Sequence, residues 1–472
     1  MRFFFIALLL CLICVKACLS VGLVEEFSWS RITYQWPEDS QLRARFLGAD
    51  AAAPRGARYR PTKPISKGDG AAAESPIVFE GNTNANVTPK NDTTSEIDQN
   101  SGSNNEVIPS SVDYQYINNI PMGANVWKDK LFITIPRRRL GVPSTLNYVP
   151  LNNAERNNVP LIPYPSWNMN LYPDTSGQLE NFVSVYRIAI DVCDRMWFVD
   201  TGIVETLGNR TQVKPHQLIA INLQTDQVIL RFNLPENVIT SATVLASLTV
   251  DTPKGSCGDA FVYFPDLAGY GLIVFSLRDR KAWRVSHNYF FLEPMAGDFN
   301  IAGHNFQWND GVFSVELSDM KSDGYRDMFF HAMSGTHMYK VSTRVLRNES
   351  LATRSFHDDD FVILGDRGPQ SQTSTADIHK PTGIMFLGLV NQNALGCWNI
   401  KKSLKTIDIV QKDDQKMIYP SDVKVSGDKV YVLTNTMPEF LYGRLNYDVT
   451  NFRVWANDVR KAVQDTKCQG GR

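Results

Sequence analysis

The chain lacks any long apolar run after its first twenty residues. No later stretch approaches the about 18 consecutive apolar residues that a membrane-spanning helix needs. It also lacks an excess of charge of either sign, because 48 lysines and arginines face 49 aspartates and glutamates. So balanced a chain has no general electrostatic attraction to nucleic acid or to an anionic membrane. We therefore expect a soluble protein that binds neither.

Familiar catalytic and cofactor signatures are also missing. The sequence contains no GxSxG elbow, no HExxH pair, no P-loop and no dinucleotide fingerprint, so it assigns no catalytic residue and predicts no cofactor. The seven histidines show no tight metal spacing; His331 and His337 flank a turn and are best explained as ordinary polar positions. The acidic run at 357–361 lacks the ligand spacing of an EF-hand and favours a solvated loop. We therefore predict no metal site.

Residues 1–20 have the features of a secretory signal peptide. Arg2 precedes the apolar run from Phe3 to Val15, and small residues stand at Cys18 and Ser20, the positions that a signal peptidase reads. Glycosylation sequons agree with a secreted, extracellular protein. They begin at Asn86, Asn91, Asn209 and Asn348.

The composition changes sharply at residues 50–111. This stretch is rich in Ala, Gly, Pro, Asn, Ser and Thr, which favours a disordered insertion that acts as a solvated linker. The alternative is a protease-sensitive segment around the basic run at 55–60. Before it, residues 21–49 contain an isolated strand predicted at 27–34, which is rich in aromatic and β-branched residues. Residues 112–472 form the main body and the C-terminal tail.

A turn followed by a short apolar strand recurs through the main body, whereas segments with a helical period are almost absent. The recurring units begin at Asp129, Asp194, Asp259, Arg326, Thr382 and Gly427, at intervals of 45 to 67 residues. Six such units with further strands between them predict an all-β, six-bladed β-propeller. A β-sandwich is the alternative, but it explains the six-fold recurrence less well. We expect each recurring strand, such as Met196–Val199, to be an inner strand beside the channel, and the strand at 27–34 to close the ring.

Four cysteines remain after the signal peptide, and in an oxidising compartment they predict two disulfides with three possible pairings. Cys193 and Cys257 each lie three residues before a recurring strand segment. They therefore occupy equivalent positions on adjacent blades, which favours a bond between them. Cys397 and Cys468 are left to join the C-terminal tail to the fifth unit.

Several blocks of the chain resemble the yellow/major royal jelly protein family of insects. They include "RIAIDVCDRMWFVDTG", "GDRGPQSQTS", "LGCWN" and "YPSDVKVSGDKVYVLTNTMPEFLYGRLNYDVTNFRV", and the resemblance extends from Phe27 to Cys468. The insertion at 50–111 is longer than the family pattern usually has there. The resemblance implies a secreted six-bladed propeller with roles in cuticle pigmentation, nutrition or salivary binding of biogenic amines. It also implies that some members convert dopachrome during melanin formation.

The propeller channel is the natural place for a ligand site, since the loops at one mouth of it converge there. In the last unit Asn435 offers a donor and an acceptor, Met437 and Phe440 offer an apolar wall, and Ser421 offers a hydroxyl. The resemblance adds that amine-binding relatives use polar and aromatic residues from this part of the chain. The alternative is that Asn435 caps a strand and Phe440 belongs to the core, which is favoured for Phe440.

Two classes of function follow. The chain is a binding protein for a small aromatic amine or catechol, or it is an enzyme that acts on dopachrome-like melanin precursors. A structural cuticle protein is a third alternative. A lactonase-like hydrolase on the same fold is less favoured, because no set of acidic and amide residues for its metal is evident. The "PRRRL" segment at 136–140 offers a patch for an anionic ligand, although an exposed turn is favoured there. The oligomeric state is not predicted.

Overall fold

The structure, a computed structural model, describes residues 22–47, 114–173, 180–253 and 255–470. The chain divides into two compact units, residues 1–37 with 114–472 and residues 38–113. In the second unit the described part contains the helix α2 (Ser40–Leu47). The expected signal peptide, the insertion at 50–111 and the sequons at Asn86 and Asn91 lie outside the described residues.

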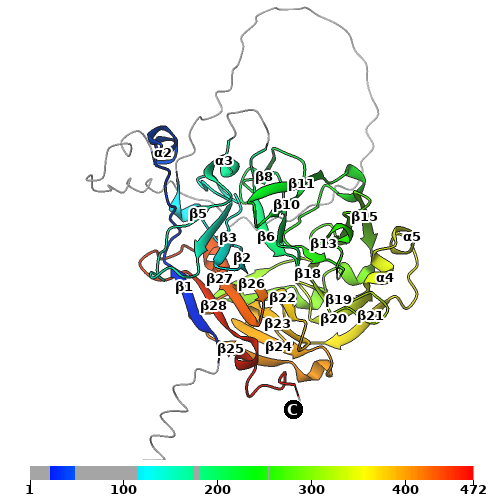
Figure 1. Cartoon of the computed structure of the whole chain (residues 1–472). Coiled ribbons are helices and arrows are strands. Elements are labelled where there is room, and N and C mark those ends of the chain that lie inside the picture. Colours follow the sequence, from blue (N-terminus) through cyan, green and yellow to red (C-terminus); the bar gives the residue numbers. More distant parts are fainter. Residues whose placement is uncertain (1–21, 48–113, 174–179, 254, 471–472) are drawn as a thin grey trace, which may run out of the picture. The chain divides into compact units, whose positions relative to one another are not determined.

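The described part of the first unit is a six-bladed β-propeller, as the sequence predicted (Figure 1). Each blade is a four-stranded antiparallel sheet. The strands of each blade follow from the centre outward. The first blade consists of β2 (Gly123–Trp127), β3 (Lys130–Thr134), β4 (Leu146–Pro150) and β5 (Ile162–Pro163), and the second of β6 (Val185–Ile190), β7 (Arg195–Asp200), β10 (Gln217–Asn222) and β11 (Gln227–Asn233). The third consists of β12 (Thr249–Asp251), β13 (Phe261–Asp266), β14 (Gly271–Ser276) and β15 (Lys281–Ser286). The fourth blade consists of β18 (Val312–Leu317), β19 (Asp327–Ala332), β20 (His337–Ser342) and β21 (Phe361–Asp366), and the fifth of β22 (Thr373–His379), β23 (Ile384–Leu389), β24 (Ala394–Asn399) and β25 (Asp408–Lys412). The sixth consists of β26 (Pro420–Ser426), β27 (Lys429–Thr434), β28 (Phe452–Asp458) and β1 (Val24–Trp29).

Short elements connect the blades. Two hairpins are formed by β8 (Ile203–Val204) with β9 (Thr211–Gln212) and by β16 (Asp298–Ile301) with β17 (His304–Gln307). The short α-helices are α3 (Trp167–Asn170), α4 (Thr343–Leu346), α5 (Glu349–Ala352), α6 (Met437–Tyr442) and α7 (Val459–Ala462). The 3₁₀ turns are η2 (Tyr116–Asn118), η3 (Glu236–Val238), η4 (Cys257–Asp259), η5 (Asn288–Phe290), η6 (Pro294–Ala296), η7 (Val390–Gln392) and η8 (Leu404–Thr406). None of the helices within the described ranges is long and apolar enough to cross a membrane.

The recurring apolar strands are the second strands of the blades, so the expectation that they are the inner strands was wrong. The strands that contact one another around the centre are β2, β6, β12, β18, β22 and β26. A second strand has apolar side chains on both faces because a neighbouring blade packs on each side, and Met196, Trp197 and Phe198 of β7 are all fully buried. Inner strands turn one face to the centre and carry polar residues there, which hides them from a search for apolar runs.

The N-terminal strand closes the ring, as predicted. β1 pairs antiparallel with β28 and becomes the outermost strand of the sixth blade. It runs over Val24–Trp29 and not over the expected 27–34, because the residues after Trp29 cross to the first blade. There the Trp29 Nε1 donates to the Val159 carbonyl at 2.8 Å, and the Tyr34 hydroxyl donates to Asn119 Oδ1 at 2.6 Å. The segment therefore joins the last blade to the first.

Both predicted disulfides are present. Cys193, in the turn between β6 and β7, is bonded to Cys257, which begins η4 ahead of β13, so this bond joins the second and third blades. Cys397 on β24 is bonded to Cys468 in the C-terminal tail. Each bond closes a long loop of chain and can contribute up to about 4 kcal/mol to the free energy of unfolding.

Charged side chains on the inner strands meet at the centre of the ring. Arg187 Nε of β6 lies 3.7 Å from Asp422 Oδ1 of β26, and Lys424 Nζ lies 3.8 Å from the same oxygen. Burial raises the pKa of Glu316 on β18 and of Asp377 on β22, and the Asp377 carboxylate raises that of Glu316 further. Burial works to lower the pKa of Lys424, but the three carboxylates outweigh it and raise that pKa. Lys424 is therefore their shared counter-ion.

Replacing this counter-ion should destabilise the propeller. We expect Lys424→Met to lower the free energy of unfolding by about 3–5 kcal/mol at pH 7, because it leaves buried carboxylates without their cation. The loss should shrink toward pH 5. Lys424 lowers the pKa values of Glu316 and Asp377, so its removal raises these folded-state pKa values further. The folded variant therefore takes up protons more readily than the folded wild type and gains more stability as the pH falls.

Thermal unfolding of the wild type and the variant at both pH values measures this effect. Lys429→Met, at an exposed position on β27, is the matched control and should change the free energy of unfolding by less than about 0.5 kcal/mol. An equal loss in the two variants, or a loss that grows at pH 5, would contradict the role assigned to Lys424.

Candidate functional site

The end of the ring where the inner strands begin carries polar and aromatic residues from several blades. Each blade repeats the same strand order, so the six inner strands start at the same end of the ring, and the antiparallel second strands end there. Tyr419 stands directly before β26, Asp310 stands two residues before β18, and Asn435 directly follows β27. We refer to this end as the channel mouth.

Ser421 and Asn435 are both completely buried and form part of the frame of the mouth. The Ser421 hydroxyl donates to the Met122 carbonyl at 2.7 Å. Asn435 Nδ2 donates to the Pro121 carbonyl at 2.8 Å, and its Oδ1 accepts from the Met437 backbone N–H at 3.2 Å. These bonds tie the sixth blade to the chain that enters the first blade, and they fix the start of α6. Contact of either side chain with a ligand stays a prediction.

Met437 and Phe440 pack from α6 against the "PRRRL" segment. Arg138 Nη1 lies 3.7 Å from Met437 Sδ, and the Arg139 guanidinium lies 4.6 Å from the centre of the Phe440 ring. Phe440 is 4% exposed and belongs to the core, as the alternative interpretation held. The structure thus brings the four predicted residues into one region, with Met122 between Ser421 and Asn435.

The "PRRRL" segment is not the exposed turn that the sequence favoured. Arg137 is buried, and its guanidinium donates to five backbone carbonyls of the surrounding loops. Arg138 is half-buried at the mouth, and its Nε is buried without a hydrogen-bond partner. One arginine therefore holds the loops together, while the next brings a cation with unused donors to the mouth.

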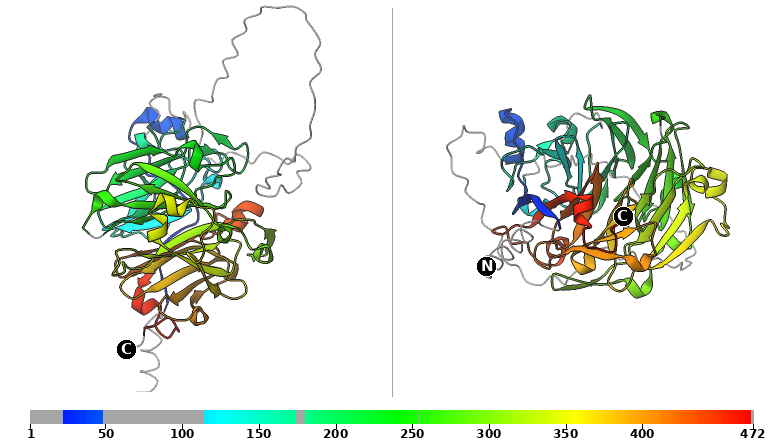
Figure 2. Two further views of the ribbon diagram at one scale, coloured as in Figure 1. Left: turned by 90° about the vertical axis from the view of Figure 1, so that its right-hand side faces the viewer. Right: turned by 60° about the horizontal axis from the view of Figure 1, so that its bottom comes forward.

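Aromatic residues form a wall beside this cation. The Trp308 indole donates to the Tyr442 hydroxyl at 2.8 Å, and its ring lies edge-on to Tyr419 with centroids 6.0 Å apart. The β16–β17 hairpin that leads to Trp308 is held against α6, because His304 Nε2 and Glu439 Oε2 are 2.6 Å apart (Figure 2). The wall is therefore built by two elements far apart in sequence.

Asp310 supplies the negative charge at the mouth. Within the described part of the chain its carboxylate has no direct hydrogen-bond or ion-pair partner, and desolvation raises its pKa to about 6 against the opposing effect of Arg138. Asp310 and Arg138 also influence the pKa values of Tyr419 and Tyr442, which burial raises. These interactions place one carboxylate, one guanidinium and two phenols close together, and the Trp308 indole joins them through Tyr442.

This cluster was missed at the level of sequence. The "WND" run at 308–310 ends two residues before β18, and Tyr419 directly precedes β26; that position is the signal that would have found them. It could not be used because the inner strands were assigned to the wrong members of each blade. Among the described residues no group of three or more His, Cys, Asp or Glu side chains could hold a metal ion.

Comparison with known proteins agrees with this architecture. The family model described as major royal jelly protein matches residues 183–468. L-dopachrome tautomerase yellow-f of Drosophila melanogaster is 39% identical over 364 residues, which cover 76% of this chain and 84% of that protein. Protein yellow of the same species is 40% identical over 365 residues, covering 76% of this chain and 66% of that protein, so the chain spans about two thirds of its length.

Solved structures add little to these matches. A Bacteroides thetaiotaomicron protein of unknown function is similar at a TM-score of 0.42 and 10% sequence identity, over 72% of this chain and 70% of that chain. So low a score supports no argument about function. The sequence matches are decisive, and the chain belongs to the major royal jelly protein family.

Proposed function

We propose that the protein is a secreted pigmentation protein that binds a small aromatic amine or catechol at the channel mouth. The Asp310 carboxylate, without a direct partner among the described residues and next to aromatic rings, is the observation that carries this proposal. A protonated amine pairs with such a carboxylate, and the ligand ring packs against Trp308 and Met437. Catechol hydroxyls find a hydroxyl at Tyr419 and a cation at Arg138.

The four residues named from sequence keep a place in this proposal. Met437, which contacts Arg138, provides an apolar wall, and Phe440 supports α6 from the core. Asn435 and Ser421 hold the loops whose shape the ligand needs. Their bonds to residues 121 and 122 make them positioning residues, and any contact with the ligand would be additional.

Conversion of a dopachrome-like substrate is the second candidate function. One relative is named L-dopachrome tautomerase, and a carboxyl group with a pKa near 6 is suited to general base catalysis at neutral pH. A tautomerisation moves a proton within the substrate and needs no oxidant or reductant. In this proposal Asp310 takes the proton from carbon, and Arg138 stabilises the negative charge that develops on the quinone oxygen.

Secretion and glycosylation belong to the same proposal. Asn209 and Asn348 are exposed, as glycan acceptors must be, although Asn348 Oδ1 also accepts from the Leu351 backbone N–H at 3.1 Å. The two disulfides fit an oxidising compartment. The protein secreted by cultured cells should lose mass when treated with peptide N-glycosidase.

Amine binding should depend on pH through Asp310. We expect the affinity for dopamine, measured by calorimetric titration, to fall about tenfold between pH 7.5 and pH 5, because a carboxyl with a pKa of about 6 becomes protonated and loses its charge. Asp310→Asn should bind weakly at both pH values. Asp465→Asn, at an exposed position outside the mouth, should behave as the wild type. A pH-independent affinity in the wild type would remove Asp310 from the site.

Asn435→Ala tests the frame of the mouth. The variant leaves the buried Pro121 carbonyl and the Met437 N–H without partners, so the free energy of unfolding should fall by about 1–3 kcal/mol. Affinity for aromatic amines or catechols should fall as well, by about 1–3 kcal/mol, because α6 loses its anchored start. Chemical unfolding and titration with dopamine, dopa and serotonin measure the two effects. Unchanged affinity in the folded variant would place the ligand elsewhere.

Titration and turnover with L-dopachrome separate the two functions. If the protein converts dopachrome, Asp310→Asn should reduce the rate by about 100-fold or more while the substrate still binds, since it removes the base. If the protein only binds, neither the wild type nor the variant accelerates the spontaneous loss of dopachrome. Failure to bind any amine or catechol would favour a structural role.

A further inference from the structure

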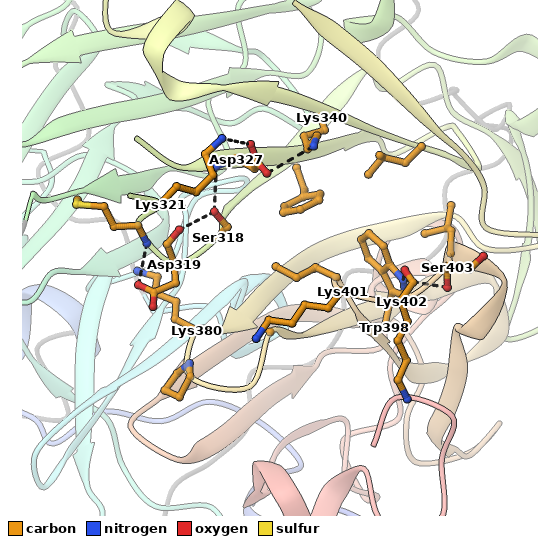
Figure 3. A pocket seen from close by; sticks show the side chains of 17 residues that line it. Ser318, Asp319, Lys321, Asp327, Lys340, Lys380, Trp398, Lys401, Lys402 and Ser403 are labelled. Carbon is orange, nitrogen blue, oxygen red and sulfur yellow. Dashed lines mark hydrogen bonds and ion pairs between the residues drawn. The ribbon is translucent and has the colours of Figure 1, made fainter. Parts of the chain in front are cut away.

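A second candidate site lies between the fourth and fifth blades, at the end of the ring away from the channel mouth. A cleft of about 610 Å³ lies between the segment that follows β18 and the turns that follow β22 and β24. Figure 3 shows the side chains that line it. β18 ends at Leu317 and β22 ends at His379, so the cleft opens where these inner strands end. It shares no residue with the cluster around Asp310 and is independent of ligand binding there, and it rests on the proposed function only for secretion.

Lysine dominates the lining of this cleft. Five lysines stand against two aspartates, a net charge of +3, and no arginine or histidine takes part: Lys321, Lys340, Lys380, Lys401, Lys402, Asp319 and Asp327. The whole chain has a formal net charge of −1. The concentration of positive charge is therefore local and does not reflect a generally basic protein.

Three of these lysines have direct partners. Lys321 and Lys340 share one carboxylate, with their Nζ atoms 2.8 Å and 3.5 Å from the two oxygens of Asp327, and Figure 3 shows them on either side of it. Lys402 Nζ donates to the backbone carbonyls of Lys467 and Gln469, which satisfies its hydrogen bonds but leaves its charge.

Lys380 and Lys401 complete the cleft from its other side. Both side chains are exposed, and neither ammonium group has a hydrogen-bond or ion-pair partner within the described part of the chain. The nearby carboxylate of Asp319 is itself 3.7 Å from Arg326 Nη1. The ammonium groups of Lys380 and Lys401 therefore remain available to a ligand. Beside them, Lys321 and Lys340 carry two positive charges against the single negative charge of Asp327.

The chemistry of the cleft identifies the class of ligand. Its aromatic residues, Phe329 and Trp398, are only 4% and 3% exposed, so they offer no surface on which a nucleobase could stack. The lining contains lysines and no arginine. A lysine ammonium group acts as a point charge and does not require the fixed two-pronged geometry that a guanidinium does, which suits sulfate and carboxylate groups distributed along a flexible chain. Hydroxyls of Ser318 and Ser403 add polar contacts at the rim. These features match a sulfated polysaccharide better than a nucleic acid.

We propose that this interblade cleft binds a sulfated glycan chain through Lys380 and Lys401, with Lys321 and Lys340 in support. Such a ligand would hold the secreted protein in an extracellular matrix while the opposite end of the ring stays open. The attraction is electrostatic and should weaken as salt screens it.

The first experiment titrates the full-length protein with a heparin-derived octasaccharide at low and at physiological salt. Wild type should bind, and Lys380→Gln with Lys401→Gln should raise the Kd about tenfold or more, because two charge-assisted contacts are lost. The matched control is Lys429→Gln with Lys461→Gln, which removes two exposed lysines outside the cleft and should leave the Kd within about twofold. No binding by the wild type, or equal weakening in both double variants, would overturn the proposal.

The second experiment identifies the group that is recognised. The octasaccharide with its sulfates removed should bind at least about tenfold more weakly than the sulfated form. If inorganic sulfate or phosphate displaces the octasaccharide at the same concentration of anionic groups, the cleft binds a small anion and the glycan assignment fails. The Lys380/Lys401 double variant should bind dopamine with the affinity of the wild type. This titration therefore distinguishes failure of the glycan proposal for the cleft from failure of the amine proposal for the channel mouth.

A third measurement needs no variant. Acetylation of the wild-type protein with a lysine-specific reagent, followed by peptide mapping, should show Lys380 and Lys401 protected by the octasaccharide and Lys429 and Lys461 unprotected. Equal labelling of Lys380 and Lys401 with and without the octasaccharide would overturn the proposal.

Discussion

The pairing of β1 with β28 is the contact on which the rest of the propeller depends. It joins residues from the two ends of the folded unit into one sheet, with Phe27 opposite Val454 and Trp29 opposite Phe452. Without it, β28 would present an unpaired edge. The chain after Trp29 then reaches the first blade, so a single segment seals both the sheet and the junction between blades. The channel mouth has a defined shape only because this ring is closed.

Closure also creates the charged centre. Arg187 and Asp422 come from the second and sixth blades, which lie on either side of the first, so they meet only when the sixth blade stands beside the first. A buried ion pair contributes little net stability by itself, because desolvation offsets its Coulombic attraction. It contributes to specificity instead, because any arrangement of the blades that separates these charges leaves a buried charge without a partner. The charges of the centre thus favour one arrangement of the blades and fill the space between the two ends of the ring.

Sequence reasoning reached the fold, the closing strand and both disulfides, because these features leave local or regularly repeated signals. Cys193 and Cys257 precede equivalent strands, and spacing alone is enough to pair them. Sequence reasoning failed where the role of a residue depends on which residues lie next to it in the folded structure. The apolar strands were assigned to the centre, yet packing between blades makes the second strand the most uniformly apolar one. The same error hid Asp310 and Tyr419, whose significance comes from their position just before an inner strand. Asn435 was proposed from sequence either as a ligand contact or as a strand cap. Its bonds to Pro121 and Met437 show a structural task, and these partners could not be named from a pattern of residue types.

The two functions proposed for the channel mouth, binding an amine and moving a proton, have overlapping physical requirements. A binding site needs Asp310 ionised so that it pairs with a cation, and a base needs it ionised so that it can accept a proton. The same pKa of about 6 serves both tasks near neutral pH. What distinguishes them is whether the acidic carbon of the ligand lies within reach of the carboxylate while its oxygen faces Arg138. In the proposed site the ligand ring would lie between Trp308 and α6, so a change in either wall would move the ring without altering the charged groups. In the proposed site, the property that decides between binding and turnover is therefore the position of the ligand ring relative to Asp310.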